Sequence, residues 1–282
     1  MPSKVIYGND YNHEVDLGLD IAAYTYRFLV EGDSWMDRSS VINGSLPWAL
    51  ADRFDQAGET ALFINVSHAG DTLQQIEGKK NGEFGDWLKA FNWPFHGVLL
   101  SAGGNDFIDW ARDPDPGKGI LNDMAGAPTA ATVDDCLNLD QMQKLVNQVL
   151  HPCFDRLDDK IRDKQKSTLV FLNAYDAPMP RNAPATPKGR TWLCESFKKN
   201  HVPESLWVAL AEALFADVES TVQGWTVGRN KTFAVPTRGT LKKAPWGTSG
   251  QQGDWQNEIH PSPQGWAKLA NVWYATMRPL LP

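Results

Sequence analysis

Five short apolar segments constrain the fold of this 282-residue chain more than any other feature of its sequence. Most of them are rich in Val, Leu, Ile, Phe and Ala and end close to Gly, Asn, Asp or Ser. They are residues 26–30, 61–66, 97–101, 168–172 and 232–235. Near-continuous apolar strands without polar alternation are typical of a parallel sheet that is covered on both faces. The pattern therefore predicts a central, mainly parallel five-stranded sheet.

Helical patterns separate these apolar segments. The predicted helices cover residues 47–56, 139–151, 154–163, 203–222 and 263–277. Pro47, Pro203 and Pro263 would each lie in a first helical turn, where the missing N–H of proline costs nothing. Strands that alternate with helices connect through right-handed crossovers, which gives an α/β fold with three layers. We therefore expect an α/β/α sandwich.

Three long stretches do not fit this alternation. Residues 110–132, 176–201 and 236–258 are rich in Pro, Gly, Asp and Lys, and their apolar residues are aperiodic. Long loops in a compact domain commonly carry function, so we expect these insertions to form the walls of a substrate pocket. No linker divides the chain into two regions of different composition. The sequence thus predicts a single domain over residues 1–282.

Composition limits the possible partners and the location of the protein. A net charge of -7 and a pI near 5.4 argue against nucleic acid, whose phosphates favour basic surfaces. No stretch approaches the roughly 20 apolar residues of a membrane helix, and the N-terminus lacks the basic start and apolar core of a secretory signal. Three widely spaced cysteines resemble neither a disulfide framework nor a zinc site. We expect a cytoplasmic protein with reduced thiols.

Polar residues follow several of the predicted strands. Ser34, the segment 67–70, Asn105 and the pair Tyr175–Asp176 all lie just past an apolar segment. In an open parallel sheet, ligands bind at the carboxyl ends of the strands. Each of these residues alone is compatible with a turn or a helix cap, but together they indicate one shared site. His260, near the C-terminus, is a candidate base for Ser34.

Four sequence blocks in this order resemble the SGNH (GDSL-type) hydrolases. They are Gly32-Asp33-Ser34, then Gly70, then Gly103-Gly104-Asn105-Asp106, then His260-Pro261, and they span most of the chain. The resemblance implies a flavodoxin-like SGNH hydrolase fold and a serine esterase that forms an acyl-enzyme. It implies that Ser34 is the nucleophile and His260 the general base. It also implies an oxyanion hole made by the backbone N–H groups of Ser34 and Gly70 and the side-chain amide of Asn105.

Position 257 departs from the family pattern. The family usually places an Asp three residues before the histidine, whereas this chain has Asn257. An Asn accepts a hydrogen bond from imidazole but cannot stabilise imidazolium as a carboxylate does, and the corresponding change in chymotrypsin-type proteases costs about 10⁴ in rate. Asn257 or a backbone carbonyl is one candidate for orienting His260. Glu258 or Asp254 is another, and a slow or inactive protein is the third possibility.

The substrate is expected to be an acyl or acetyl ester of a small molecule, a lipid or a carbohydrate. Trp35, Trp110 and Trp255 are candidate substrate-binding residues, because tryptophan offers a broad apolar face and one N–H donor. Neither a cofactor nor a metal site is predicted, since the six histidines form no closely spaced ligand motif with Asp. The competing hypotheses are a module that binds carbohydrate or lipid without turnover and a metal-dependent phosphoesterase.

Overall fold

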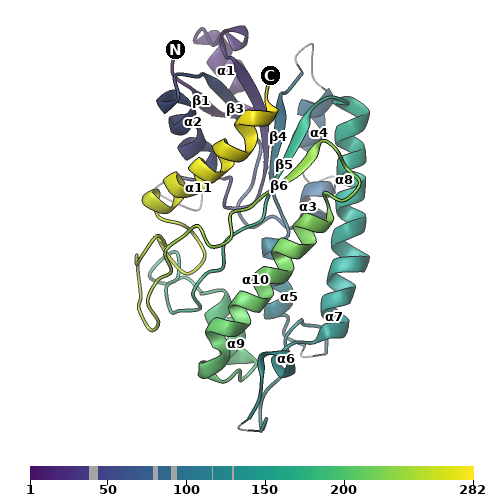
Figure 1. Cartoon of the computed structure of the whole chain (residues 1–282), viewed down its shortest axis with the longest axis vertical. Coiled ribbons are helices and arrows are strands. Elements are labelled where there is room, and N and C mark those ends of the chain that lie inside the picture. The colour runs from purple at the N-terminus through teal and green to yellow at the C-terminus, as the bar shows by residue number, and fades with distance from the viewer. Residues whose placement is uncertain (38–43, 79–81, 90–93, 116, 129) are drawn as a thin grey trace.

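The computed structural model describes residues 1–37, 44–78, 82–89, 94–115, 117–128 and 130–282. Its core is one sheet of parallel strands in the order β1-β3-β2-β4-β5-β6 (Figure 1). The strands are β1 (Lys4–Tyr7), β2 (Tyr26–Gly32), β3 (Ala61–Asn65), β4 (Gly97–Ser101), β5 (Leu169–Asn173) and β6 (Thr232–Val235). All five predicted strands are present, and the predicted parallel α/β architecture is confirmed.

The prediction of five strands was wrong by one, because β1 was missed. This strand pairs with β3 at the edge of the sheet, and of its four residues only Ile6 is fully buried. An edge strand with one covered face needs no continuous apolar run, since hydrogen bonding to its neighbour defines it. A search for apolar segments therefore could not find it.

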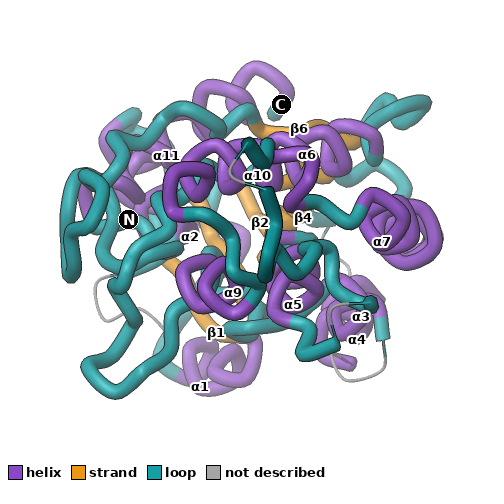
Figure 2. Tube along the Cα trace, turned by 90° about the horizontal axis from the view of Figure 1, so that it is seen from below, coloured by secondary structure: helices purple, strands orange, loops and turns teal. Residues whose placement is uncertain are grey.

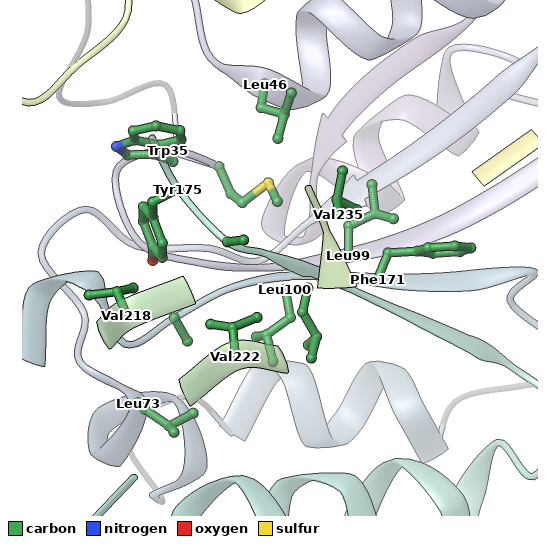
Figure 3. Packing of buried hydrophobic residues seen from close by; sticks show 14 of the residues in the cluster. Trp35, Leu46, Leu73, Leu99, Leu100, Phe171, Tyr175, Val218, Val222 and Val235 are labelled. Carbon is green, nitrogen blue, oxygen red and sulfur yellow. The ribbon is translucent and has the colours of Figure 1, made fainter. Parts of the chain in front are cut away.

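Helices cover both faces of the sheet. On one face, α2 (Leu46–Gln56) packs against α11 (Pro263–Met277). The other face carries α3 (Leu73–Glu77), α4 (Gly82–Lys89), α8 (His151–Lys164) and α10 (Trp207–Gly224). Figure 3 shows the apolar side chains of both layers, with Leu46 on one side of the strands and Leu73, Val218 and Val222 on the other. The three predicted layers are thus present.

The remaining helices lie outside these two layers or extend them. They are α1 (Tyr11–Asp16), α5 (Gly104–Arg112), α6 (Val133–Cys136), α7 (Leu139–Lys144) and α9 (Leu193–Lys199). The helix α7 runs through a π-helical turn, Leu145–Leu150, into α8, so the two helices predicted there form one helical segment. Pro152 lies in the first turn of α8, just after the π-helical turn, and a π-turn is a common way to accommodate a local break in helical hydrogen bonding.

Two of the three predicted proline positions are found in a first turn. Pro47 and Pro263 each lie there, in α2 and α11. Pro203 instead precedes a short 3₁₀ turn, Glu204–Leu206, that leads into α10. The insertion 176–201, predicted to be a loop, contains α9, whose seven residues are too short to give a clear helical period in the sequence.

The order of the strands indicates where on the sheet a ligand would bind. Without β1, the order β3-β2-β4-β5-β6 is that of flavodoxin-like folds. From β2 the chain first goes to β3 on one side and then to β4 on the other, so the strand order reverses at β2. A crevice at the carboxyl end of that point is the usual ligand site. Figure 2 looks onto this edge and shows α5, α9 and long loops in front of the strands. None of the helices in the described part of the chain is long and apolar enough to span a membrane.

Candidate active site

The turn after β2 presents Ser34 at the carboxyl edge of the sheet. Gly32 ends the strand with φ +147°, and a Cβ atom at this position would lie 2.5 Å from the carbonyl oxygen of Ser101 on β4. Only glycine allows the two strands to approach this closely. The next residue, Asp33, donates its backbone N–H to the same Ser101 carbonyl at 3.1 Å. The packing of β2 against β4 thereby fixes the turn that carries Ser34.

A buried hydrogen-bond network supports this turn from behind. The carboxylate of Asp33 accepts hydrogen bonds from the backbone N–H of Trp35 at 3.0 Å, the hydroxyl of Ser101 at 2.9 Å and the hydroxyl of Tyr175 at 2.5 Å. Burial raises the pKa of Asp33 to about 6, although all three donors favour the charged form. The side-chain amide of Asn173 donates to Ser101 at 3.1 Å and links β5 to the network. Asp33 is therefore a structural anchor of the Ser34 turn.

Ser34, His260 and Asn257 form a continuous hydrogen-bonded chain. The Oγ atom of Ser34 lies 2.7 Å from Nε2 of His260, and Nδ1 of His260 lies 3.0 Å from Oδ1 of Asn257. All three side chains are buried, with exposed fractions of 6%, 2% and 4%. Ser34 and His260 are 226 residues apart in the sequence, so only the fold brings them together. The arrangement is that of a nucleophile, a base and a group that orients the base.

The orientation of the Asn257 amide determines which nitrogen of His260 carries the proton. Oδ1 of Asn257 also accepts the backbone N–H groups of Ile259 at 3.1 Å and His260 at 2.9 Å. Backbone N–H groups only donate, so the amide oxygen and not the amide nitrogen must face them. The same oxygen faces Nδ1 of His260, which must therefore donate. Nε2 is left unprotonated toward Ser34, which is the tautomer that a general base requires.

Burial also controls the charge of His260. It lowers the pKa of the imidazole to about 4, because the charged form loses its hydration in this site. The ring is neutral at neutral pH and can accept a proton from Ser34. No charge on Asn257 compensates the imidazolium ion that would form during catalysis. As a candidate base, His260 is thus correctly oriented but electrostatically weak.

The two other candidates for the third catalytic position are engaged elsewhere. Asp254 accepts the backbone N–H of Lys242 and the ammonium group of Lys268, each at 2.6 Å. Glu258 is fully buried and accepts the backbone N–H groups of Arg181, Trp192 and Cys194. Neither carboxylate is hydrogen-bonded to His260, and burial raises the pKa of Glu258 to about 7.

Glu258 instead connects two of the insertions. Its carboxylate lies at the N-terminal end of α9, in the insertion 176–201, while its own chain belongs to the loop that carries His260. Arg181 makes the reverse connection, since its guanidinium donates to the carbonyl oxygen of Asn257 at 2.7 Å. The indole of Trp192 then packs edge-on against the His260 ring at 5.4 Å between ring centres. The sequence offered Glu258 only as a direct partner of His260, and it did not identify Arg181, because no local pattern distinguishes either role.

The three predicted oxyanion donors lie on neighbouring loops. Among the hydrogen bonds between described residues, none uses the backbone N–H of Ser34 or of Gly70 as donor. The side-chain amide of Asn105, in the first turn of α5, donates one hydrogen to the carbonyl oxygen of Asp71 at 3.0 Å and keeps a second. Ser34 and Asn105 border the same small cavity, whereas Gly70 is exposed and does not line it, although Asn105 contacts the residue that follows Gly70.

The three candidate tryptophans differ in their placement. Trp255 is 1% exposed and packs in the core beside Trp35, so its ring presents no surface to a ligand. Trp35 is also buried, donates to the carbonyl oxygen of Ile259 at 3.2 Å and borders the cavity at Ser34. Trp110, on α5, is half-buried and packs against the core. The tryptophan that contacts His260 is Trp192, which was not among the three.

One group of side chains in the described residues has the geometry of a metal-ligand set. Ligand atoms of Glu31, His68 and Asp71 lie within 4.8 Å of one another. Glu31 is fully buried, and its Oε2 atom has no hydrogen-bond partner. Glu31 lies on β2, and the other two residues flank Gly70, so the sequence spacing gave no indication of the group. The sequence prediction of no metal site did not anticipate it.

Comparison with known proteins identifies the fold but not the roles of residues. No family model and no curated protein matches the sequence. An extracellular lipase from Streptomyces rimosus has a similar structure, with 17% identity and a TM-score of 0.55 over 89% of this chain and 99% of the lipase. Two further structures match less closely. They are phospholipase A1 from Streptomyces albidoflavus NA297 (15% identity, TM-score 0.49, 89% and 98% covered) and a Clostridium thermocellum family 3 carbohydrate esterase (17%, 0.48, 91% and 99%).

Proposed function

We propose that this chain, which has the fold of the SGNH hydrolases, is a serine esterase that cleaves carboxylic esters through an acyl-enzyme on Ser34. The hydrogen-bonded chain from Ser34 through His260 to Asn257 carries this proposal. It supplies a hydroxyl nucleophile, an unprotonated Nε2 at 2.7 Å and a fixed tautomer. The three residues lie at the carboxyl ends of the strands, beside β2, where the strand order reverses. Folds of this kind bind their ligands there.

The first half of the reaction forms the acyl-enzyme. Oγ of Ser34 attacks the ester carbonyl carbon while Nε2 of His260 takes the hydroxyl proton. The carbonyl oxygen becomes an oxyanion, which the N–H groups of Ser34 and Gly70 and the amide of Asn105 would stabilise. The carbon–oxygen bond to the alcohol then breaks, and His260 returns the proton to the leaving alkoxide. The alcohol departs and the acyl group stays on Ser34.

The second half repeats these steps with water. His260 removes a proton from a water molecule, whose oxygen attacks the acyl carbon. Collapse of the second tetrahedral intermediate breaks the bond to Oγ and releases a carboxylic acid. His260 gives its proton back to Ser34, which restores the enzyme. No cofactor is needed at any step, and Asn257 holds the tautomer throughout.

Substitution of the two reacting residues tests the proposal. With p-nitrophenyl acetate as substrate, Ser34→Ala and His260→Ala should each lower kcat by about 10³-fold or more, because they act as one unit. Ser220→Ala, at an exposed position of α10, is the control and should leave kcat unchanged. Hydrolysis at the wild-type rate by Ser34→Ala would refute the serine mechanism. Measurable turnover by the wild-type chain would exclude a module that only binds carbohydrate or lipid.

A metal-dependent phosphoesterase is the second candidate, and the group Glu31, His68 and Asp71 is the observation that favours it. One histidine with two carboxylates suits a divalent ion that activates water. A chelator separates the two candidates. A serine esterase keeps its activity in EDTA, whereas a metal-dependent enzyme loses it and recovers with added Zn²⁺ or Mn²⁺. Hydrolysis of p-nitrophenyl phosphate that requires His68 and not Ser34 would favour the metal mechanism.

A further inference from the structure

Glu31 is a buried carboxylate whose hydrogen bonds satisfy it only in part. It lies near the end of β2 and is fully buried. Its Oε1 atom accepts the backbone N–H of Gly32 at 2.8 Å, whereas Oε2 has no hydrogen-bond partner among the described residues. An unpaired buried carboxylate oxygen is costly, so buried charges in proteins are paired or coordinate metal ions. The environment of Glu31 therefore favours a cation beside it.

The loop 67–71, which follows β3, brings a histidine and a second carboxylate to Glu31. Ligand atoms of Glu31, His68 and Asp71 lie within 4.8 Å of one another, and Nδ1 of His68 lies 3.9 Å from Oδ2 of Asp71. A tetrahedral Zn²⁺ ion with bonds of about 2.0–2.2 Å holds its ligand atoms roughly 3.3–3.6 Å apart. His68 is exposed, so its ring is free to turn and close this difference. One imidazole and two carboxylates suit Zn²⁺ or Mn²⁺.

The charges around this group also favour a cation. Burial raises the pKa of Glu31 well above its ordinary value, and the neighbouring carboxylates of Asp71 and Glu83 raise it further. A divalent ion would compensate two of these negative charges. His68 and Glu83 line an open pocket, which Ser34 does not border in the part of the chain that the structure describes. An ion can therefore enter from the side of His68, away from the nucleophile.

The three ligands belong to two chain segments that meet beside the candidate nucleophile. Glu31 is on β2, while His68 and Asp71 flank Gly70, which is exposed and has φ +85°. A backbone hydrogen bond of 3.0 Å from His68 to the carbonyl oxygen of Gly32 already joins the loop 67–71 to β2. An ion bound by the three side chains would add a second connection at the same place.

We propose that Glu31, His68 and Asp71 bind a divalent transition-metal ion, Zn²⁺ or Mn²⁺, which holds the loop 67–71 against β2. Water would complete the coordination of the ion. This inference goes beyond the proposed function, because ester hydrolysis at Ser34 uses no metal. It also differs from the phosphoesterase candidate, in which the ion activates a water molecule for attack. Here the ion links two segments of the chain, and the reaction stays with Ser34 and His260.

Calorimetric titration with Zn²⁺ measures the binding directly. After dialysis against EDTA and removal of the chelator, the wild-type chain should bind Zn²⁺, and Glu31→Gln and His68→Ala should each weaken this binding by about 100-fold or more. Glu31→Gln keeps the shape of the buried side chain, and His68→Ala changes an exposed residue, so both variants should fold. Asp123→Asn is the matched control, because Asp123 pairs with the exposed His201 at 2.7 Å. It should leave the binding unchanged.

Two further measurements test the connection to the loop. An ion that binds only the folded chain stabilises it, so saturating Zn²⁺ should raise the Tm of the wild type by about 3 °C or more. Amide hydrogen exchange in the loop 67–71 should slow by about 10-fold, because the ion opposes local opening. Neither change should occur in His68→Ala.

The outcomes separate this inference from both candidate functions. Absence of Zn²⁺ and Mn²⁺ binding, or binding that persists in both Glu31→Gln and His68→Ala, would overturn the site. Binding that leaves hydrogen exchange in the loop 67–71 unchanged would overturn the connection to β2. Zn²⁺-dependent hydrolysis of p-nitrophenyl phosphate that His68→Ala abolishes would assign the ion to phosphoesterase chemistry instead. Ester hydrolysis by Ser34 is measured in EDTA, so its presence or absence leaves the result for the ion unaffected.

Discussion

The two halves of the candidate catalytic chain are equally buried but are built in different ways. The nucleophile side consists of Ser34, the turn Gly32–Asp33 and the groups that hold it, Ser101 and Tyr175. The base side consists of the loop Asp254–His260 and the insertion 176–201 that contacts it. Neighbouring strands of the sheet hold the first side. Gly32 packs against Ser101 on β4, and Asp33 accepts hydrogen bonds from Ser101 and from Tyr175, which lies just after β5. Loops and the start of α9 hold the second side. Glu258 accepts the backbone N–H of Cys194, and Arg181 donates to the backbone carbonyl of Asn257.

This difference indicates where each side is sensitive to change. The register of the strands leaves no alternative position for the nucleophile. A bulkier side chain in the turn that carries Ser34 should therefore lower the free energy of unfolding. The base depends on hydrogen bonds between two loops, so substitutions there should act first on the orientation and charge of His260. Four predictions test this comparison, from the largest expected effect to the smallest.

Gly32→Ala should have the largest effect. The added Cβ would lie 2.5 Å from a backbone oxygen of β4, in a backbone conformation that L residues rarely adopt. We expect the free energy of unfolding to fall by about 3 kcal/mol or more. Urea denaturation measures the loss. Gly85→Ala, in the interior of α4 with open space around its Cβ, is the control and should be neutral or slightly stabilising. A loss of less than 1 kcal/mol in Gly32→Ala would contradict the role given to the β2–β4 contact.

The pH dependence of stability should reveal the buried base. The pKa of His260 is about 4 in the folded protein, and that of an unfolded histidine is near 6.5. As pH falls below about 6.5, the unfolded chain binds a proton before the folded protein does. The contribution of His260 to the free energy of unfolding is therefore fully present above that pH and is lost as pH falls toward 4. The loss amounts to about 3 kcal/mol.

The buried carboxylates act with the opposite sign, so a difference measurement is needed. The raised pKa values of Asp33, Asp106 and Glu258 reduce stability as pH increases from about 4 to 7. Comparing wild type with His260→Gln at each pH cancels these shared contributions. Parallel stability curves of the two proteins between pH 7 and 4 would show that His260 is not desolvated. For the active protein, the acid limb of kcat/KM should lie near pH 4 for the same reason.

Glu258→Gln should weaken the base side. The carboxyl group accepts backbone N–H groups of the insertion 176–201, and a glutamine would direct its own N–H₂ at some of these donors. We expect a loss of about 1–3 kcal/mol in stability. Because Trp192 and His260 are in contact, kcat should fall as well. Glu204→Gln, at an exposed position in the 3₁₀ turn before α10, is the control. Unchanged stability and kcat in Glu258→Gln would show that Glu258 does not help to position His260.

Asn257→Asp should have the smallest effect and the opposite direction, a gain in activity. A carboxylate at this position would stabilise the imidazolium ion and raise the pKa of His260. Because the amide of Asn257 already fixes the correct tautomer, the gain in kcat should be about 10-fold, far below the about 10⁴-fold associated with a wrong tautomer. The acid limb of the pH profile should move upward with it. A gain near 10⁴-fold would mean that Asn257 does not hold the tautomer, and no gain would mean that a neutral acceptor suffices.

Much of the nucleophile side could be predicted from the sequence. The run 26–30 followed by Gly32-Asp33-Ser34 placed a serine at a strand end, and the run before Gly103-Gly104-Asn105 did the same for the amide. Parallel strands bring such ends to one edge, so short sequence patterns were sufficient. The edge strand β1 was missed because one-sided burial leaves no apolar run.

The base side could be predicted only in part. The sequence named His260 as the candidate base and Asn257 as the residue at the orienting position, with Glu258 or Asp254 as alternatives. Their roles depend on which donors each one meets, and the donors to Glu258 lie 64 to 77 residues away in the sequence. The metal-ligand group of Glu31, His68 and Asp71 also has no local signature.

The sequence by itself determined the strand-and-helix alternation, the parallel sheet and the set of polar residues at its carboxyl edge. These follow from the burial of apolar runs and from turn chemistry, which act over short distances along the chain. The tertiary structure alone decided which atoms meet at that edge. It directs the amide oxygen of Asn257 at His260, assigns Glu258 to α9 and leaves space for about one water molecule beside Ser34. Hydrogen-bond direction and cavity size are properties of packed groups in three dimensions, so no local pattern specifies them.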